Sequence, residues 1–259
     1  MGTEALNIRP INKNLIVPVS FVKTNFLFGV NLKDDDGQEM PDSLHEFYIR
    51  SATEWLQSEL EIYLGPVEVT NEAHDFYYND YAAYNFLRSF CRPIRKLTKM
   101  TLEFPVNSDK IEFDPEWFRC EFMSGHISSI PSQGSLSKFI IGAGGTFLPA
   151  LHIHDHLPFV LRIDYEAGYE NPSDIPSDLL EIVGMKASMG PLNIAGDLIA
   201  GAGIATKSLS LDGLSQSIGT TSSATNAGYG ARIIQYNKEI AERLAILKTK
   251  YRAIAMVTA

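Results

Sequence analysis

The sequence predicts an α+β fold, in which a helical core carries an inserted antiparallel β-rich region and ends in a long C-terminal helix. Three observations lead to this prediction. Apolar residues recur at helical spacing after residue 42 and again near the end of the chain, and between residues 67 and 165 they alternate along several segments. Alternation with period two is typical of strands that bury one face, so the two helical patterns flank a sheet-forming region.

We expect five segments along the 259 residues. Proline and glycine positions and the changes in apolar period set their boundaries. The segments are an extended N-terminal arm at 1–41, a helical core from 42–66 and 170–204, a β-rich insertion at 67–169, a hairpin and flexible linker at 205–230, and a C-terminal helix and tail at 231–259. Within the arm, residues 15–19 and 26–30 are expected to form short strands.

The first predicted helix covers residues 42–64. Ser43 with Glu46 three positions later forms a capping box, in which each side chain bonds to a backbone N–H of the other residue. Tyr48, Ala52 and Leu56 then place apolar side chains on one face. The following Gly-Pro pair at 65–66 ends the helix.

The strand patterns lie at residues 98–104, 111–113, 118–122 and 159–165, where apolar and polar side chains alternate. A further helix begins near Pro176, because proline suits the first turn, and it is expected to end at Gly190–Pro191. A second short helix is expected at 192–200.

The segment after this core contains a hairpin signal. Two short runs, 208–211 and 214–218, flank the Asp212–Gly213 dipeptide, which favours a tight hairpin turn. A single two-stranded hairpin is only marginally stable in water, so we expect it to dock on another surface.

The last helix is predicted from about residue 231 to 255, with apolar residues stepping by four and three. This stripe suits two interpretations, which the sequence leaves open: packing against a helix of another chain, or packing on the chain's own core. The stripe consists of Ile240, Leu244, Leu247, Tyr251 and Ile254.

Composition narrows the classes of partner. The formal net charge is −9, which argues against a nucleic-acid-binding surface, because such surfaces need clustered lysine and arginine. An acidic surface either keeps the protein soluble or repels DNA phosphates. The cysteines, Cys91 and Cys120, are expected to be reduced, which fits assembly in a host cytoplasm. We expect neither a signal peptide nor a membrane span.

One segment suggests metal chemistry. His152, His154 and His156 with Asp155 could bind zinc, and they resemble the HxHxDH signature of metallo-β-lactamase-like hydrolases with one residue fewer. That site needs further ligands downstream, and no histidine follows His156. A metal-dependent hydrolase is therefore the less favoured alternative. We expect no catalytic, cofactor-binding or metal-binding residues and no cofactor.

Four segments in order resemble phage head-to-tail connector proteins of the adaptor or neck type, which bind the portal. They are the helical run 46–56, Arg-Pro-Ile at 92–94 with the strands after it, the run 162–179 from a strand into a helix, and 210–215 followed by 230–233 and the final helix. The resemblance extends from residue 42 to about 255 and lies in the order and composition of the segments.

The resemblance implies a structural virion protein without enzymatic activity, located in the neck between capsid and tail. Such proteins typically form twelve-subunit rings below the portal, and DNA passes through them without sequence-specific binding. The implied partners are further copies of the chain, the portal, and other neck or tail proteins; no membrane is involved. A head-completion or tail-terminator ring protein is the alternative. The expected portal or subunit contacts are Leu211, Asp212, Gly213, Leu214, Arg232, Ile240, Leu244, Leu247, Tyr251 and Ile254.

Overall fold

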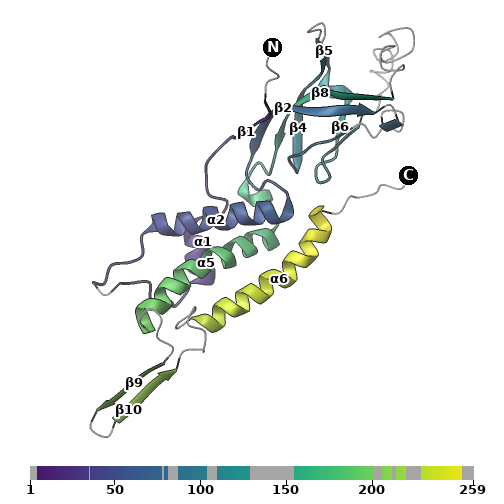
Figure 1. The fold of residues 1–259 in the computed structure, drawn as a ribbon. Helices are drawn as coiled ribbons and strands as arrows, with labels where there is room; N and C mark the ends of the chain where they lie inside the picture. Colours follow the sequence, from purple (N-terminus) through teal and green to yellow (C-terminus); the bar gives the residue numbers. More distant parts are fainter. Residues whose placement is uncertain are drawn as a thin grey trace, which may run out of the picture. The chain divides into compact units, whose positions relative to one another are not determined.

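The computed structural model describes residues 5–34, 36–77, 79–80, 87–103, 110–128, 155–200, 206–211, 214–219 and 229–252. They belong to two compact units (Figure 1). The first comprises described residues within 1–13 and 61–174, and the second comprises those within 14–60 and 175–252. The first is built from strands and the second mainly from helices, so the predicted α+β class is confirmed.

The main sheet of the β-rich unit is antiparallel, with the strand order β1-β2-β8-β4-β5. Its strands are β1 (Asn7–Pro10), β2 (Val67–Tyr77), β8 (His156–Ala167), β4 (Ile94–Glu103) and β5 (Lys110–Phe113). A second, three-stranded sheet has the order β3 (Leu87–Arg88), β7 (His126–Ser128), β6 (Arg119–Cys120). The strands expected near 98–104, 111–113 and 159–165 are therefore confirmed, whereas in the 118–122 pattern only β6 is paired.

Strand β8 lies at the centre of the main sheet. Its residue Ala167 pairs with Val67 of β2, and Tyr165 pairs with Leu97 of β4. The alternation in the sequence now has its cause, because Leu161, Ile163, Tyr165 and Ala167 point into one core. That core also takes up apolar side chains of the other strands, including Val69, Phe76, Met100, Leu102 and Ile127.

A close backbone approach fixes the end of β8. Gly168 has a φ of +87°, which residues with a side chain rarely adopt, and its N–H donates to the carbonyl oxygen of Pro93 at 2.8 Å. A Cβ at this position would collide with the backbone carbonyl of Gly65. Only glycine therefore fits between the chain entering β2 and the chain leaving β8.

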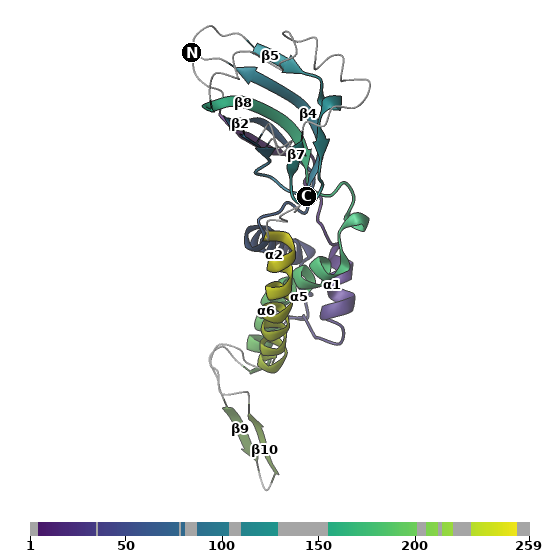
Figure 2. The ribbon, with the colours of Figure 1, turned by 90° about the vertical axis from the view of Figure 1, so that its right-hand side faces the viewer.

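Four helices make up most of the described helical unit: α1 (Val19–Phe26), α2 (Asp42–Leu60), α5 (Ser177–Ala200) and α6 (Gly230–Arg252). Figure 1 and Figure 2 together show α2, α5 and α6 next to one another, and contacts join each pair of them. The apolar face predicted for α2 is buried at Ala52 and Leu56, whereas Tyr48 is half-buried and the neighbouring Ile49 is buried in addition. This helix ends four residues earlier than expected, because Glu61 adopts a left-handed φ of 56°.

Helix α1 corrects the expectation of an arm extended throughout, and the strands expected at 15–19 and 26–30 do not form: α1 covers 19–26, and residues 15–18 and 27–30 are turns or irregular. Pro18 occupies the N-cap position in an extended conformation, and proline is compatible with a helix start. Val22 is then buried, and the ring of Phe26 meets that of Tyr236 on α6 at a centroid distance of 6.2 Å. Burial against the other helices therefore outweighs the β-propensity of these side chains.

Helix α5 corrects the expectation of two helices separated at Gly190–Pro191. It runs without a break from Ser177 to Ala200, with Pro191 in its interior. Proline costs one backbone hydrogen bond, but Leu192 and Ala195 beyond it remain buried. Gly190 lies against the ring of Tyr48, where a Cβ would collide, so this glycine permits close packing of α5 on α2.

The expected hairpin is confirmed at the level of the backbone. Strand β9 (Thr206–Leu211) pairs with β10 (Leu214–Gly219) in an antiparallel register that sets Leu211 opposite Leu214. The two residues between them in the sequence, Asp212 and Gly213, lie outside the described residues.

Candidate functional site

The residues predicted to contact the portal or other subunits lie in two places. Leu211 and Leu214 close the paired ends of β9 and β10. Arg232 and the apolar stripe lie on α6, while Asp212, Gly213 and Ile254 fall outside the described residues. The structure therefore places the hairpin strands between α5 and α6 in the chain, but it does not gather all the predicted residues into one site.

The stripe on α6 packs inside the chain's own helical unit. Ile240, Leu244, Leu247 and Tyr251 are buried, and α6 contacts both α2 and α5. Of the two interpretations left open by the sequence, the structure shows packing on the chain's own core for these four side chains. They are therefore not available as an exposed surface of the folded chain.

Ion pairs link α6 to the neighbouring helices α5 and α2. Arg243 forms ion pairs with Glu181 on α5 and with Glu239, the second of which is 2.6 Å long and follows the helical i, i+4 spacing. The hydrogen bond to Glu181 raises the pKa of Arg243 further. Lys248 pairs with Glu59 of α2 at 2.5 Å. The i, i+4 pair can be read from the sequence, whereas the pairs between helices depend on the fold.

Arg232 lies in the first turn of this helix and is half-buried. Its guanidinium lies over the ring of Tyr236, 5.9 Å from the ring centroid, which is a cation–π arrangement. Elsewhere on α6, two large apolar side chains remain in solvent, Ile234 and Ile246, of which Ile246 is 71% exposed. The sequence pattern did not point to these two positions, because they are not part of the 4-3 spacing that defines the apolar stripe.

Further exposed apolar side chains are distributed over the helical unit. Large exposed apolar groups on a soluble chain mark candidate contact positions when several occur together. In addition to those on α6, the helical unit exposes Phe28, Phe47 and Leu198.

The histidine segment does not form a metal cluster in the part of the chain that the structure describes. His152 and His154 lie outside that part. His156 lies at 3.1 Å from a carboxylate oxygen of Asp75 and stacks on Tyr77, with ring centroids 4.6 Å apart. The pKa of Asp75 is lowered, mainly by the hydrogen bond from the backbone N–H of Phe159 and to a smaller extent by the hydrogen bond with His156. Among the described residues, no group of three or more His, Cys, Asp or Glu side chains is arranged to hold a metal ion.

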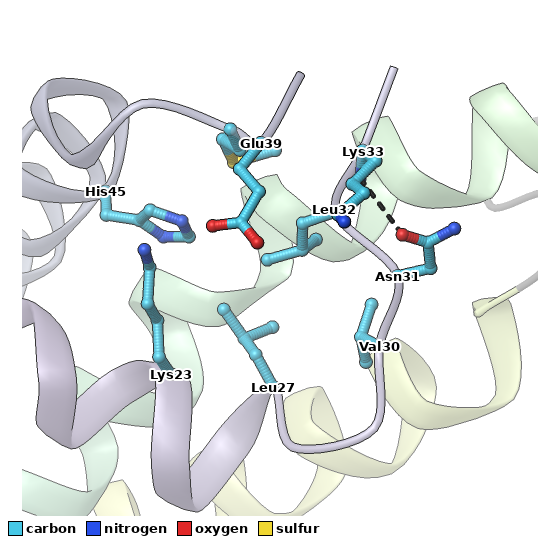
Figure 3. Close-up of a pocket in the computed structure, with 9 residues that line it drawn as sticks. Lys23, Leu27, Val30, Asn31, Leu32, Lys33, Glu39 and His45 are labelled. Carbon is cyan, nitrogen blue, oxygen red and sulfur yellow. Dashed lines mark hydrogen bonds between the residues drawn. The ribbon is translucent and has the colours of Figure 1, made fainter. Parts of the chain in front are cut away.

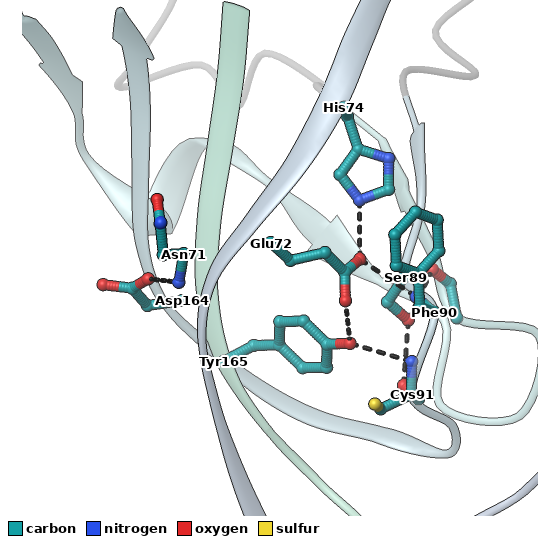
Figure 4. Close-up of polar contacts among 9 residues, drawn as sticks. Asn71, Glu72, His74, Ser89, Phe90, Cys91, Asp164 and Tyr165 are labelled. Carbon is teal, nitrogen blue, oxygen red and sulfur yellow. Dashed lines mark hydrogen bonds and ion pairs between the residues drawn. The ribbon is translucent and has the colours of Figure 1, made fainter. Parts of the chain in front are cut away.

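A buried carboxyl group lies within the β-rich unit (Figure 4). Glu72 is fully buried; one oxygen accepts from the backbone N–H of Phe90 at 3.0 Å and lies 2.6 Å from Nε2 of His74. The other oxygen accepts from the hydroxyl of Tyr165 at 2.5 Å. That hydroxyl in turn accepts from the N–H of Cys91 at 2.8 Å.

These bonds connect β2 and β8 to the segment of residues 89–91 that follows β3. Burial is the main cause that raises the pKa of Tyr165 and that of the Cys91 thiol, so neither group is prepared to act as a nucleophile. Because both carboxyl oxygens have partners, the network stabilises the fold and offers no open position for a substrate. Sequence reasoning did not find it, since its members are spread over almost a hundred positions.

No helix in the described residues has the length and apolar character that crossing a membrane requires.

Comparisons with known proteins identify no family model and no curated protein that match this chain. Among solved structures, the chain is similar to one in the neck of an empty GTA particle computed with C6 symmetry, at 16% identity, with 71% of this chain and 82% of that chain covered and a TM-score of 0.41. It is also similar to a chain in the virion of the native gene transfer agent (GTA) particle, at 14% identity, with 97% and 98% covered and a TM-score of 0.47.

A third similar chain lies in the neck of the native GTA particle computed with C12 symmetry, at 14% identity, with 71% and 81% covered and a TM-score of 0.40. TM-scores this low do not establish a shared fold, so the function is inferred below from the residues of this chain.

Proposed function

We propose that this chain is a structural virion protein of a tailed phage, a head-to-tail connector (adaptor) that forms a ring below the portal. One observation carries the proposal. Helices from both sides of the β-rich insertion, α2 before it and α5 and α6 after it, pack into one unit, and the hairpin β9–β10 stands between α5 and α6 in the chain. This is the order of elements on which the resemblance to connector proteins rests.

Ring formation requires contacts between different surfaces of neighbouring copies. The α6 stripe is occupied within the chain, so we assign these contacts to the exposed apolar side chains of the helical unit and to the hairpin. The hairpin with Leu211 and Leu214, together with Arg232, is the proposed contact with the portal. A two-stranded hairpin that is marginal alone gains stability when it docks.

The charge of the chain suits a channel through which DNA moves. A formal net charge of −9 repels the phosphate groups of DNA, whereas binding of phosphate by lysine and arginine would slow the passage of DNA. The proposed interaction with DNA is therefore weak and independent of sequence.

Native mass spectrometry of the purified chain tests the proposal, over a range of concentrations and with the portal of the same particle. We expect metal-free closed rings, on the portal or alone, with about the twelve subunits that the resemblance implies. A metal-bound monomer or dimer that does not bind the portal would contradict the proposal. Rings that form but do not contact the portal would favour a head-completion or tail-terminator protein instead.

A hairpin variant tests the portal contact. Residues 206–219 are replaced by a Gly-Ser linker, because deleting α6 would uncover the buried faces of α2 and α5 and unfold the unit. We expect the variant to keep its helical circular dichroism and to lose attachment to the portal. The matched control is Asn237→Asp, a near-isosteric change at an exposed position of α6, which should attach normally. Normal attachment of the linker variant would refute the assignment of the hairpin.

A further inference from the structure

A pocket of about 220 Å³ lies in the helical unit, between α1, the loop that follows it and the start of α2 (Figure 3). Apolar side chains of Leu27, Val30 and Leu32 form part of its wall. This volume is below the range of about 300–1,000 Å³ typical of sites for drug-sized ligands. The pocket therefore has room for one amino-acid side chain or a molecule of similar size.

The polar part of the pocket contains a histidine whose ring nitrogens are unused. His45, on the first turn of α2, is only 1% exposed, and neither Nδ1 nor Nε2 has a hydrogen-bond partner among the described residues. Figure 3 shows its ring directed into the pocket, toward the carboxylate of Glu39. Burying a polar group without a partner costs stability, which a ligand that bonds to it would restore.

Two opposite charges flank this imidazole. The Nζ atom of Lys23 lies beside it and donates to Asp42 at 2.7 Å, which leaves two further N–H donors on the same ammonium group. The carboxylate of Glu39 lies on the other side and accepts only. Burial, followed by the charge of Lys23, lowers the pKa of His45, so at neutral pH the ring has one donor and one acceptor nitrogen.

These groups discriminate among simple polar ligands. A carboxylate is attracted by Lys23 but repelled by Glu39, and an ammonium group meets the reverse. The other charged lining residue, Lys33, lies on the side of the pocket away from the imidazole (Figure 3). A primary carboxamide is neutral, and it offers an oxygen to the lysine and N–H groups to the glutamate and the imidazole. Its aliphatic stem matches the apolar wall.

We propose that this pocket binds a primary carboxamide on a short aliphatic stem, the chemistry of a glutamine or asparagine side chain. The group comes either from a protein partner or from a free amide-bearing molecule. Phe28 favours the protein source: it stands between the wall residues Leu27 and Val30 in the chain and is 81% exposed, as expected of an apolar contact next to an inserted side chain. Binding of the carboxamide does not require ring formation, although Phe28 is also one of the exposed apolar side chains assigned above to ring contacts.

The test follows the Cε1–H signal of His45 by NMR in the full chain labelled at its six histidines. The signal is assigned with His45→Phe. The probes are N-acetylglutamine amide, the corresponding derivatives of glutamate and norvaline, and free glutamine. We expect a saturable shift with the glutamine derivative, and affinity about tenfold or more lower for the glutamate and norvaline derivatives, because a site built for hydrogen bonds rejects analogues that lack them.

A charge-neutralising variant identifies the acceptor. Glu39→Gln should weaken binding of the glutamine derivative, while Asp36→Asn, the same change in the same loop at a residue outside the pocket, should not. Both positions are exposed, so both variants should fold.

Each outcome bears on the proposal. Binding of the blocked derivative but not of free glutamine supports a protein source, and tighter binding of free glutamine supports a small molecule. Equal or tighter binding of the glutamate or norvaline derivative would overturn the proposal, and so would the absence of a His45 shift with all four probes. Equal affinities of Glu39→Gln and Asp36→Asn would overturn it as well.

Discussion

Replacing Tyr165 by phenylalanine would remove one hydroxyl from the core of the β-rich unit. That hydroxyl donates to Glu72 at 2.5 Å and accepts from the N–H of Cys91 at 2.8 Å. Because the ring is fully buried, phenylalanine preserves its packing and deletes only these two bonds. A hydrogen bond to a carboxylate contributes about 1.5–3 kcal/mol, and a buried N–H left without a partner costs about 1–3 kcal/mol. We therefore expect Tyr165→Phe to lower the free energy of unfolding by about 3 kcal/mol.

Urea unfolding followed by tryptophan fluorescence measures this loss. The chain has one tryptophan in each unit, Trp55 on α2 and Trp117 in the short 3₁₀ helix Pro115–Trp117, so a Trp55→Phe background reports on the β-rich unit alone. A loss of this size moves the urea midpoint by about 2 M. The control is Tyr77→Phe, which removes an exposed hydroxyl with one long bond of 3.4 Å and should cost less than about 0.5 kcal/mol. Equal midpoints for the two variants would refute the structural role of the network.

Three further predictions concern stability. His45→Leu should raise the free energy of unfolding by about 1–3 kcal/mol, because it removes two buried nitrogens without partners among the described residues; a loss measured by urea unfolding would contradict their assignment. Burial is the main cause that lowers the pKa of His45 and His126, so protonation of these two groups leaves the free energy of unfolding unchanged above their ordinary pKa of 6.5 and reduces it as the pH drops below that value; urea midpoints that rise on acidification would contradict this. Gly168→Ala should lower the free energy of unfolding by more than about 3 kcal/mol, measured by thermal or urea unfolding, because it adds a backbone collision to the unfavourable φ. The control Gly37→Ala, at a φ of +79° with open space around it, should cost about 1 kcal/mol. Equal losses for the two variants would exclude the collision.

Much of the fold could be predicted because apolar period determines it. The alternation at 159–165 predicts β8, and the Asp212–Gly213 signal predicts a hairpin whose paired ends are Leu211 and Leu214. Helix α1 could not be predicted in this way, since its residues favour strands and become helical through burial of Val22 and the ring contact of Phe26 with Tyr236. The tendency of proline to end a helix also failed as a guide at Pro191, because the buried Leu192 and Ala195 beyond it keep α5 continuous.

The candidate sites were harder to predict, because spacing shows that a face is apolar but not what covers it. The 4-3-4 steps from Ile240 to Tyr251 suit a neighbouring chain and the chain's own core equally, and only the packed helices decide between them. His45 has no distinguishing signal in the sequence. Its burial arises from Lys23 and Leu27 on one side and from the loop carrying Glu39 on the other, and these contacts exist only once the helical unit is assembled.

The pairing of Val67 with Ala167 has a consequence for the order in which the chain folds. Described residues within 14–60 and 175–252 meet in one helical unit, although residues 61–174 separate the two segments in the sequence. Bringing the two segments together across an unstructured connection of that length costs about 4 kcal/mol of chain entropy. When β2 and β8 are already paired, the connection shortens to the few residues on either side, and the cost falls by about 2 kcal/mol. We therefore expect the strands to fold first and to speed helix assembly, so that substitutions that weaken the β2–β8 pairing would slow the refolding of the helical unit.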